Sequence, residues 1–599
     1  MKRLLLLTIL TLCIYSICFS QTTTKYDISF DNAVHHEAQI SVYFDNLEEK
    51  VLEVRMSRTS PGRYALHEFA KNVYNVKAYD ENGNELSITR PNPHQWNVSG
   101  HNGTVRFEYT LFANRGDGTY SQVDETHAHL NMPATFAWAR SYEHRPIEIT
   151  FNTDFDQNWK VATQLKQLEG NRYHAPDLDY FLDSPVEIAD FHLREKEVDG
   201  QNIRMVLHTH ASNDEVDDYF ENVIAIVNRQ RDVFGKLPAF DYGEYTFLNC
   251  YMPNASGDGM EHRNSTIVTG SKSMDQELGN YRISTIAHEF FHVWNVERIR
   301  PASLEPFDFE EANMSGELWF AEGFTSYYTN LTLVRAGIIS EKDYVDGLAG
   351  GINYVSNSPG RNYHNPIEMS YQAPFVDAAR SVDPTNRENT FISYYTYGSV
   401  LGLALDLSLR NEANNLNLDE FMRLVWDKYG KDEIPYTVRD IRDALSEYAG
   451  DEFSNDFFSR YIYDSKLPDY QQLLETAGVS LEKANADKAV LGTAIAIENG
   501  VGKLRTNAIV DSPIYDAGIN RNDNIISIDG VLLSEVESVD EILSTHKPGD
   551  RIEILFNRMG EQFTADVELA EDPTIQTELD QTASSAQLQT RGSWLMINW

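Results

Sequence analysis

The chain has very few cysteines for its length. Only three occur among 599 residues, and two of them, Cys13 and Cys18, lie within the first twenty. The remainder keeps Cys250 alone, so an internal disulfide after residue 20 is excluded. A chain of this length buries a large apolar core without covalent cross-links, and its size predicts several domains.

Positive charge is also scarce. Lys and Arg number 50 against 91 Asp and Glu, which gives a formal net charge of −41. A surface with this balance repels nucleic acid and anionic membranes, so we expect neither as a partner. Apolar runs long enough to span a bilayer are also missing after residue 20, and no stable membrane insertion is predicted.

Residues 1–20 have the pattern of a cleavable signal peptide. Two basic residues precede a short apolar stretch that ends near Ile17, and a small residue, Ser20, follows. Cys18 raises the alternative of a lipid-modified leader, but the bulky Ile17 before it disfavours that signal. We therefore expect an exported protein, periplasmic or extracellular in a bacterium.

The most informative stretch is residues 288–292, which read His288-Glu289-Phe290-Phe291-His292 inside an apolar run from Tyr281 to Val296. Two histidines four apart on a helix lie on one face, where both imidazoles can bind one zinc. The adjacent Glu289 can act as a base toward a zinc-bound water. Burying these polar groups is costly unless something pairs with them, and a metal does so.

A hydrolytic zinc site needs a third protein ligand and an open position for water. Glu322 is the best candidate, because it is the only charge in a strongly apolar turn, residues 318–324. A second helix is predicted around it from Gly316 to Ala336, ending at Gly337. The alternative role of Glu322 is a capping or salt-bridging one. The expected metal is one Zn²⁺ per chain, held by His288, His292 and Glu322.

These two helices together resemble the gluzincin, or thermolysin-like, zinc metallopeptidases. The longer run 288–301 (HEFFHVWNVERIRP) resembles one branch of them, the glycyl aminopeptidase family. Three further segments carry the same resemblance: Gly259-Met260-Glu261-His262 with Ser265, Tyr394-Tyr395-Thr396-Tyr397-Gly398, and Pro61-Gly62-Arg63-Tyr64 through Val73. The resemblance covers nearly all of the chain after the leader.

The resemblance implies roles for residues that match the family pattern. Glu261 would anchor the free amino group of the substrate, and a carboxylate in a partly dry cleft suits an ammonium. The strand that carries Gly259, Met260 and Glu261 would lie beside the cleft and pair with the substrate backbone. Cleavage would then fall after the first residue, with a preference for small N-terminal residues such as Gly or Ala.

The same resemblance assigns Glu289 and Tyr395 to the chemistry. Glu289 would take a proton from water and pass it to the leaving amine. Tyr395 would donate a hydrogen bond to the oxyanion, with Tyr394 and Tyr397 as competing candidates for that role. Two alternatives to an aminopeptidase stay open: a zinc endopeptidase with the same site, or a peptide-binding scaffold whose peptidase domain is inert.

The predicted fold is multidomain α+β. Residues 21–191 alternate in short segments separated by turns, which predicts an antiparallel β domain. Residues 192–482 would form a thermolysin-like catalytic domain with a helical C-terminal lobe. Residues 483–570 resemble a PDZ domain, which either binds a peptide or C-terminus at its sheet edge or only packs on its neighbour. Residues 571–599, rich in Thr, Ser and Gln, are predicted to form a flexible tail.

Overall fold

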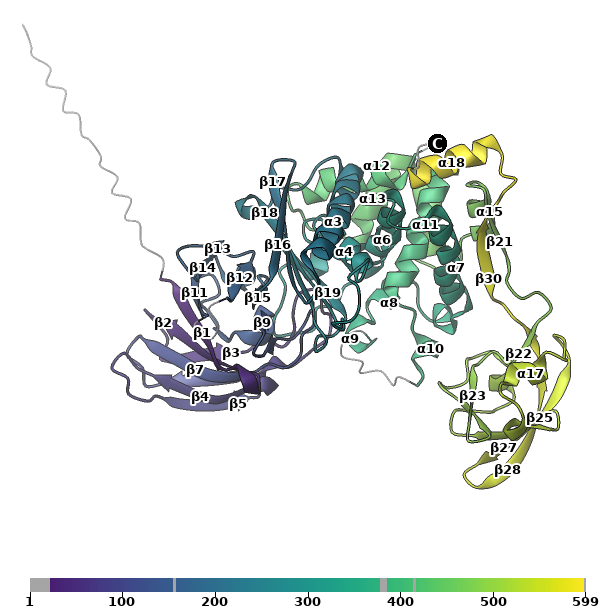
Figure 1. Cartoon of the computed structure of the whole chain (residues 1–599), viewed down its shortest axis with the longest axis horizontal. Helices are drawn as coiled ribbons and strands as arrows, with labels where there is room; N and C mark the ends of the chain where they lie inside the picture. Colours follow the sequence, from purple (N-terminus) through teal and green to yellow (C-terminus); the bar gives the residue numbers. More distant parts are fainter. Residues whose placement is uncertain (1–21, 154–157, 377–384, 413–415, 597–599) are drawn as a thin grey trace, which may run out of the picture.

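A computed structural model describes residues 22–153, 158–376, 385–412 and 416–596. Three bodies follow one another along the chain: a β-rich N-terminal domain, a central domain with a large helical lobe, and a small β domain near the C-terminus (Figure 1). This arrangement confirms the multidomain α+β prediction. The predicted signal peptide, residues 1–20, lies outside the described residues. Within the described residues, no helix combines the length and apolar character needed to cross a bilayer.

The N-terminal domain is built on three sheets, one of seven strands and two of four. Apolar side chains alternate along its strands, as in β2, where Ala38, Ile40, Val42 and Phe44 are buried and form part of the domain core. Its strands are β1 (Thr24–Asn32), β2 (Glu37–Phe44), β3 (Val51–Arg55), β4 (Val73–Tyr79), β5 (Ser87–Asn92), β6 (Gln95–Ser99), β7 (Val105–Phe112), β8 (Gln122–Val123), β9 (His127–Leu130), β10 (Trp138–Ala139), β11 (Ile147–Asn152), β12 (Lys160–Thr163), β13 (Lys166–Gln167), β14 (Arg172–Ala175) and β15 (Val186–Ala189).

The central domain begins with a five-stranded sheet in the order β16-β17-β18-β20-β19. Its strands are β16 (His192–Val198), β17 (Gln201–Thr209), β18 (Glu244–Tyr251), β19 (Asp258–His262) and β20 (Ser265–Gly270). The parallel pair β17 and β18 is joined by α3 (Asn213–Phe234). A capping box between Ser212 and Glu215 begins α3, and Gly235, in the left-handed conformation, ends it. β19, the strand that carries Glu261, stands at the edge of this sheet.

The helical lobe packs around two neighbouring helices, α6 and α11. The backbones of these helices approach closely at two glycines, because a Cβ on Gly398 of α11 would meet the Gly323 Cα of α6 at 2.6 Å. This close approach places the first turn of α11 beside α5 and α6. The main helices of the lobe are α4 (Ile283–Phe291), α5 (Leu318–Ala321), α6 (Gly323–Arg335), α7 (Glu341–Asn357), α11 (Tyr394–Glu412), α12 (Leu418–Val425), α13 (Val438–Ala449), α14 (Asp451–Phe457) and α15 (Tyr470–Glu475).

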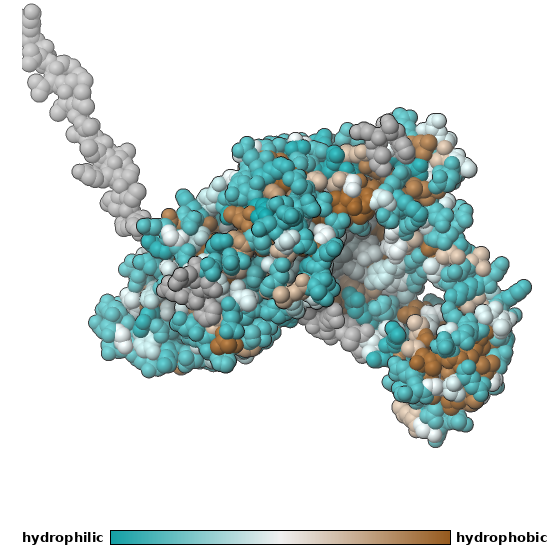
Figure 2. Space-filling model, viewed as in Figure 1, coloured by the Kyte–Doolittle hydropathy of each residue, from teal (hydrophilic) through white to brown (hydrophobic). Residues whose placement is uncertain are grey.

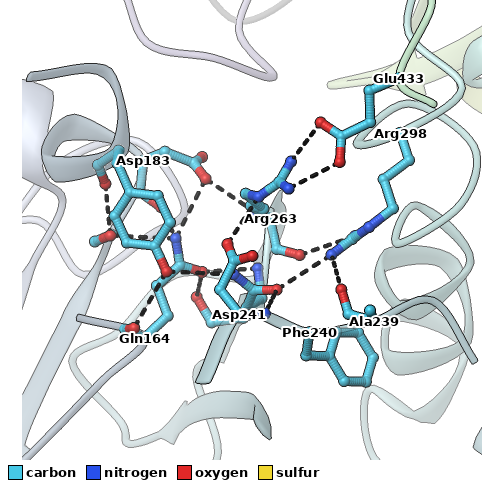
Figure 3. A network of polar contacts seen from close by, with 12 residues as sticks. Gln164, Asp183, Ala239, Phe240, Asp241, Arg263, Arg298 and Glu433 are labelled. Atoms are coloured by element: carbon cyan, nitrogen blue, oxygen red, sulfur yellow. Dashed lines mark hydrogen bonds and ion pairs between the residues drawn. The ribbon is translucent and has the colours of Figure 1, made fainter. Parts of the chain in front are cut away.

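A polar network centred on Arg263 joins the N-terminal domain, the sheet and the helical lobe (Figure 3). Its guanidinium donates to both carboxylate oxygens of Glu433, at 2.9 and 2.8 Å, and to Asp241 at 2.8 Å. Its backbone amide donates to Asp183 of the N-terminal domain at 3.0 Å. Bidentate pairing of this kind fixes orientation as well as distance, so the network holds the domains in register.

The small β domain near the C-terminus, predicted to be a PDZ domain, has its own apolar core and contacts the helical lobe through a few polar groups. Asn389 of α10 (Arg387–Thr390) donates to the Ala508 carbonyl at 3.0 Å and accepts from the Val510 amide at 2.9 Å. Hydrophilic residues cover most of the visible face of the molecule, while hydrophobic residues gather on the PDZ domain (Figure 2). The domain contains β23 (Ile495–Glu498), β24 (Val501–Leu504), β25 (Asn524–Ile528), β27 (Arg551–Arg558), β28 (Glu561–Glu568) and α17 (Val539–Leu543).

The prediction of a flexible tail over residues 571–599 is wrong for its described part. β30 (Ile575–Leu579) pairs with β21 (Val479–Lys483) in a two-stranded sheet apart from the β23–β28 sheet, and α18 (Ser585–Leu595) follows. The Trp594 indole is fully buried and donates to the Tyr327 hydroxyl at 2.9 Å. The prediction rested on the Thr, Ser and Gln content of the segment and did not consider the apolar end of α18. Burial of that apolar end offsets the entropy lost when the segment becomes ordered.

Candidate active site

Three side chains from α4, α5 and α6 converge on one point. α4 is shorter than predicted: it ends at Phe291, and His292 is its C-cap residue with φ −63° and ψ −17°. The Nε2 atoms of His288 and His292 lie 3.2 Å apart. Glu322 stands at the junction of α5 and α6, with its Oε2 atom 3.5 Å from His288 Nε2 and 3.3 Å from His292 Nε2.

This geometry fits a divalent metal. Zn–N and Zn–O bonds of about 2.0–2.2 Å at tetrahedral angles place ligand atoms roughly 3.3–3.6 Å apart, close to the observed separations. Glu322 is buried, and its Oε2 atom has no hydrogen-bond partner among the described residues. A buried carboxylate oxygen aimed at two imidazole nitrogens is costly alone and is satisfied by a cation between them.

The far nitrogens of both histidines make contacts that fix their tautomers. His292 Nδ1 lies 2.6 Å from the Asn295 carbonyl, which only accepts, so this nitrogen carries the proton. His288 Nδ1 lies 3.2 Å from Thr329 Oγ1, whose own proton goes to the Thr325 carbonyl. Both Nε2 lone pairs are therefore left for a metal, the arrangement that supporting contacts give to ligating histidines.

The pKa values of the two glutamates of the site are shifted in opposite directions. Burial together with the neighbouring Glu261 raises the pKa of Glu289 well above its ordinary value. Burial acts in the same direction on Glu322, but the imidazoles of His292 and His288 outweigh it and hold the pKa of Glu322 well below its usual range. Glu322 is thus suited to stay ionised as a ligand, and Glu289 to accept a proton.

Strand β19 places Glu261 against the same site. One carboxylate oxygen of Glu261, one of Glu289 and a nitrogen of His292 lie within 4.8 Å of one another. The Glu261 side chain is buried, and none of the described residues forms a hydrogen bond or ion pair with its carboxylate. A buried carboxylate without such a partner indicates a cationic group of a ligand as its partner.

The other two predicted substrate-binding residues have different surroundings. A Cβ on Gly259 would meet Glu289 Oε1 at 2.2 Å, so only glycine lets the Glu289 carboxylate lie against β19. The Met260 side chain is buried and faces Gly62 of the N-terminal domain, where a Cβ would meet the Met260 sulfur at 2.2 Å. Met260 can therefore offer a substrate its backbone, while its side chain packs between domains.

Of the three candidate tyrosines, Tyr395 lies nearest the metal site with part of its ring exposed. Its ring centroid is 5.9 Å from that of His288. Tyr394 is buried, stacked on Tyr395 at 4.9 Å. The Tyr397 hydroxyl is buried without a hydrogen-bond partner among the described residues, and the charged groups that affect its pKa, Arg361 and Asp464, belong to another part of the lobe.

The structure adds two residues that sequence reasoning left in the N-terminal domain. The Tyr64 hydroxyl donates to Glu322 Oε1 at 2.6 Å, across 258 positions of sequence. The Arg63 guanidinium donates to the Gly259 carbonyl at 3.2 Å and pairs with Asp258. The sequence signal for these residues was the resemblance of residues 61–64 to a family signature. That resemblance identified the N-terminal domain but did not indicate that its residues contact the metal site.

We expect Tyr64→Phe to weaken metal binding about 10- to 100-fold, because loss of a supporting hydrogen bond on a ligand has this typical effect. Competition with a fluorescent zinc chelator measures it. Tyr394→Phe, which alters a buried neighbour of the same ring cluster, is the matched control. Equal zinc affinity in wild type and Tyr64→Phe would show that the contact with Glu322 does not support the metal.

Comparison with known families agrees with the geometry. Residues 25–190 match the peptidase M61 N-terminal domain, residues 281–401 the M61 glycyl aminopeptidase family and residues 478–569 the PDZ domain. The comparison with curated proteins gives no match.

One solved structure with a high TM-score shares the fold. An aminopeptidase N family protein from Idiomarina loihiensis is 24% identical with a TM-score of 0.83, covering 96% of this chain and 100% of its own. An M1 zinc metallopeptidase from Deinococcus radiodurans is 12% identical with a TM-score of 0.43, over 75% of this chain and 95% of its own. The predicted family, fold class and enzyme class are confirmed: residues 281–401 belong to the M61 glycyl aminopeptidase family of metallopeptidases, with an M61 N-terminal domain before them and a PDZ domain after them.

Proposed function

We propose that this protein is an exported aminopeptidase that hydrolyses the first peptide bond of peptides with a free N-terminus and prefers a small first residue, Gly or Ala. One observation carries the proposal: the buried Glu261 carboxylate has no hydrogen-bond or ion-pair partner among the described residues and lies beside Glu289 and His292. An ammonium bound there places the first peptide bond, one residue further along, next to the metal ligands. The predicted leader at residues 1–20 supports export to the periplasm or beyond.

His288, His292 and Glu322 would hold one Zn²⁺. When bound, the metal supplies Lewis acidity toward the carbonyl and lowers the pKa of a water. Glu289 takes the proton of the attacking water and delivers it to the leaving amine, a role that its raised pKa favours. The Tyr395 hydroxyl donates a hydrogen bond to the substrate carbonyl oxygen as negative charge develops there.

β19 orients the substrate along its free edge. Gly259 and Met260 pair with β20 on one side, and their position at the edge of the sheet leaves the other side for an extended peptide. Arg63 holds the Gly259 carbonyl from the N-terminal domain. The PDZ domain packs on α10; a second peptide or a C-terminus bound at its sheet edge is a further part of the proposal.

Glu261→Gln tests the aminopeptidase assignment against an endopeptidase with the same metal site. We expect kcat/KM for glycine and alanine p-nitroanilides to fall on the order of 10²- to 10³-fold, because a buried charge pair with the substrate ammonium is lost. Wild type should leave N-acetylated versions of these substrates uncleaved. Glu317→Gln is the matched control, since this buried glutamate is bound by Ser303 and Ser315.

Two results would contradict the proposal. Efficient cleavage of internal bonds in N-acetylated peptides by wild type, unchanged in Glu261→Gln, would favour the endopeptidase. A zinc-loaded wild type that hydrolyses none of a panel of peptides and amides would favour the inert scaffold.

A further inference from the structure

A second group of metal-ligating side chains lies away from the active site, where the N-terminal domain meets the catalytic sheet. Its members, called here the interdomain cluster, are His127, Glu187, His208 and Cys250. All four are buried, and one ligand atom of each lies within 4.8 Å of the other three. None of them has a part in the proposed aminopeptidase chemistry.

Two pairs of strands bring these residues together. His127 and Glu187 come from β9 and β15, which are adjacent in the N-terminal domain. His208 and Cys250 face each other across the parallel pair β17 and β18, where they are register partners. The cluster therefore joins two side chains from each domain, and neither domain alone holds the set.

The distances match a tetrahedral zinc site. His127 Nδ1 lies 3.1 Å from His208 Nδ1 and 3.1 Å from Glu187 Oε1, and Cys250 Sγ lies 3.6 Å from both histidine nitrogens. His208 Nδ1 is 3.6 Å from Glu187 Oε1. Zn–N bonds of about 2.0–2.1 Å and Zn–S bonds of about 2.3 Å place nitrogen pairs roughly 3.3 Å apart and N–S pairs roughly 3.6 Å apart.

Hydrogen bonds among these groups carry an electrostatic cost that a bound cation would remove. The Gln122 amide nitrogen donates to the Asn254 carbonyl, so its oxygen faces His127 Nε2 at 3.2 Å and accepts the proton of that nitrogen. A neutral His127 then turns its Nδ1 lone pair toward the Glu187 carboxylate, which is repulsive. Protonating Nδ1 as well would give Glu187 a hydrogen, and the Cys250 thiol could donate to His208 Nδ1, but this buries a second charged imidazole beside His129. A cation between these groups satisfies all of them together.

The surrounding charges suit a divalent ion. His129 Nδ1 lies 2.9 Å from Glu187 Oε2, and its Nε2 lies 2.9 Å from the Asp117 carbonyl, so both nitrogens donate and the ring is positively charged. Asp124 lies 3.5 Å from His127 Nε2. A doubly charged cation and the charged His129 together carry three positive charges. They balance the three negative charges of the Cys250 thiolate and the Glu187 and Asp124 carboxylates.

We propose that His127, Glu187, His208 and Cys250 form a second, structural Zn²⁺ site that fastens the N-terminal domain to the catalytic sheet. Four protein ligands leave no open position for water, which separates this site from the catalytic one. A mixed set of imidazole, thiolate and carboxylate in a tetrahedral arrangement favours zinc among the common divalent ions. The site would stabilise the domain contact that also delivers Arg63 and Tyr64 to the active site.

Zinc content of the purified full chain, measured by inductively coupled plasma mass spectrometry, tests the proposal. Wild type should carry two zinc ions per chain, Cys250→Ser one, and the double variant His288→Ala with His292→Ala one. All three substitutions together should leave none. His67→Gln replaces a buried histidine of the N-terminal domain outside the cluster and should keep both ions.

One zinc in wild type and none in the double variant at His288 and His292 would overturn the second site while leaving the active-site proposal intact. Two ions retained in Cys250→Ser would overturn the proposed ligand set. If Cys250→Ser fails to fold, the absorption spectrum of cobalt-substituted wild type provides the test. We expect a thiolate-to-cobalt charge-transfer band. That band would be assigned to Cys250, because it is the only cysteine outside the predicted leader. Absence of that band in the fully loaded protein would contradict the proposal.

Discussion

Replacing Glu289 by Gln is expected to lower kcat/KM roughly 10²- to 10⁴-fold, the range that general acid–base groups contribute. Glutamine keeps the size of the side chain but cannot accept a proton from water or pass it to the leaving amine. Glu289 is buried against Gly259, and burial with the neighbouring Glu261 raises its pKa, so no other described group is as well placed for this role. Steady-state rates on alanine p-nitroanilide measure the effect.

Zinc content is the control for the Glu289→Gln experiment. Because Glu289 is not among the three side chains that face one another at the metal position, the variant should bind as much zinc as wild type. A variant with full zinc and near wild-type rates would assign the base to another group.

His292→Ala is expected to abolish hydrolysis by removing the catalytic zinc. The imidazole supplies one of three protein ligands, and its Nδ1 contact with the Asn295 carbonyl sets its orientation. Loss of a ligand should weaken binding beyond the roughly 10- to 100-fold that follows loss of a supporting contact. We expect one zinc fewer per chain by mass spectrometry, and activity below detection after dialysis.

The matched control for His292→Ala is His262→Gln, which replaces a buried histidine that contacts Asp183 at 2.9 Å and lies outside the metal-ligating groups. It should keep the zinc content of wild type. A His292→Ala protein that retains both its zinc and its activity would mean that His288, Glu322 and other groups suffice, and the proposed ligand set would be wrong.

The helix that carries the two histidines of the candidate metal site was predictable because its pattern is local. Four residues separate His288 from His292, and helical periodicity alone places them on one face. The apolar turn around Glu322 was equally clear, and the structure brings its carboxylate to within 3.5 Å of both imidazoles. The exact end of the helix was not predictable, since α4 stops at Phe291 through contacts made by the following turn.

The interdomain contacts were beyond the reach of sequence patterns. Tyr64 and Glu322 meet across 258 positions, and the four residues of the interdomain cluster come from four strands of two domains. The sequence positions of Cys250 and its partners form no recognisable motif. A spacing motif reveals metal ligands only when they lie close together along the chain. α18 was missed for a related reason: its Trp594 is buried by distant residues of the helical lobe, Tyr327 and Tyr344 among them.

The sequence by itself determined the enzyme family, the order of the domains and the residues of the helix that carries the two histidines, because each depends on periodicity and spacing within a short segment. Only the tertiary structure decided which side chains complete the site, why no described residue pairs with the Glu261 carboxylate, and where the interdomain cluster forms. Those features depend on how sheets and helices from distant segments pack, and packing is fixed by the whole core rather than by local pattern.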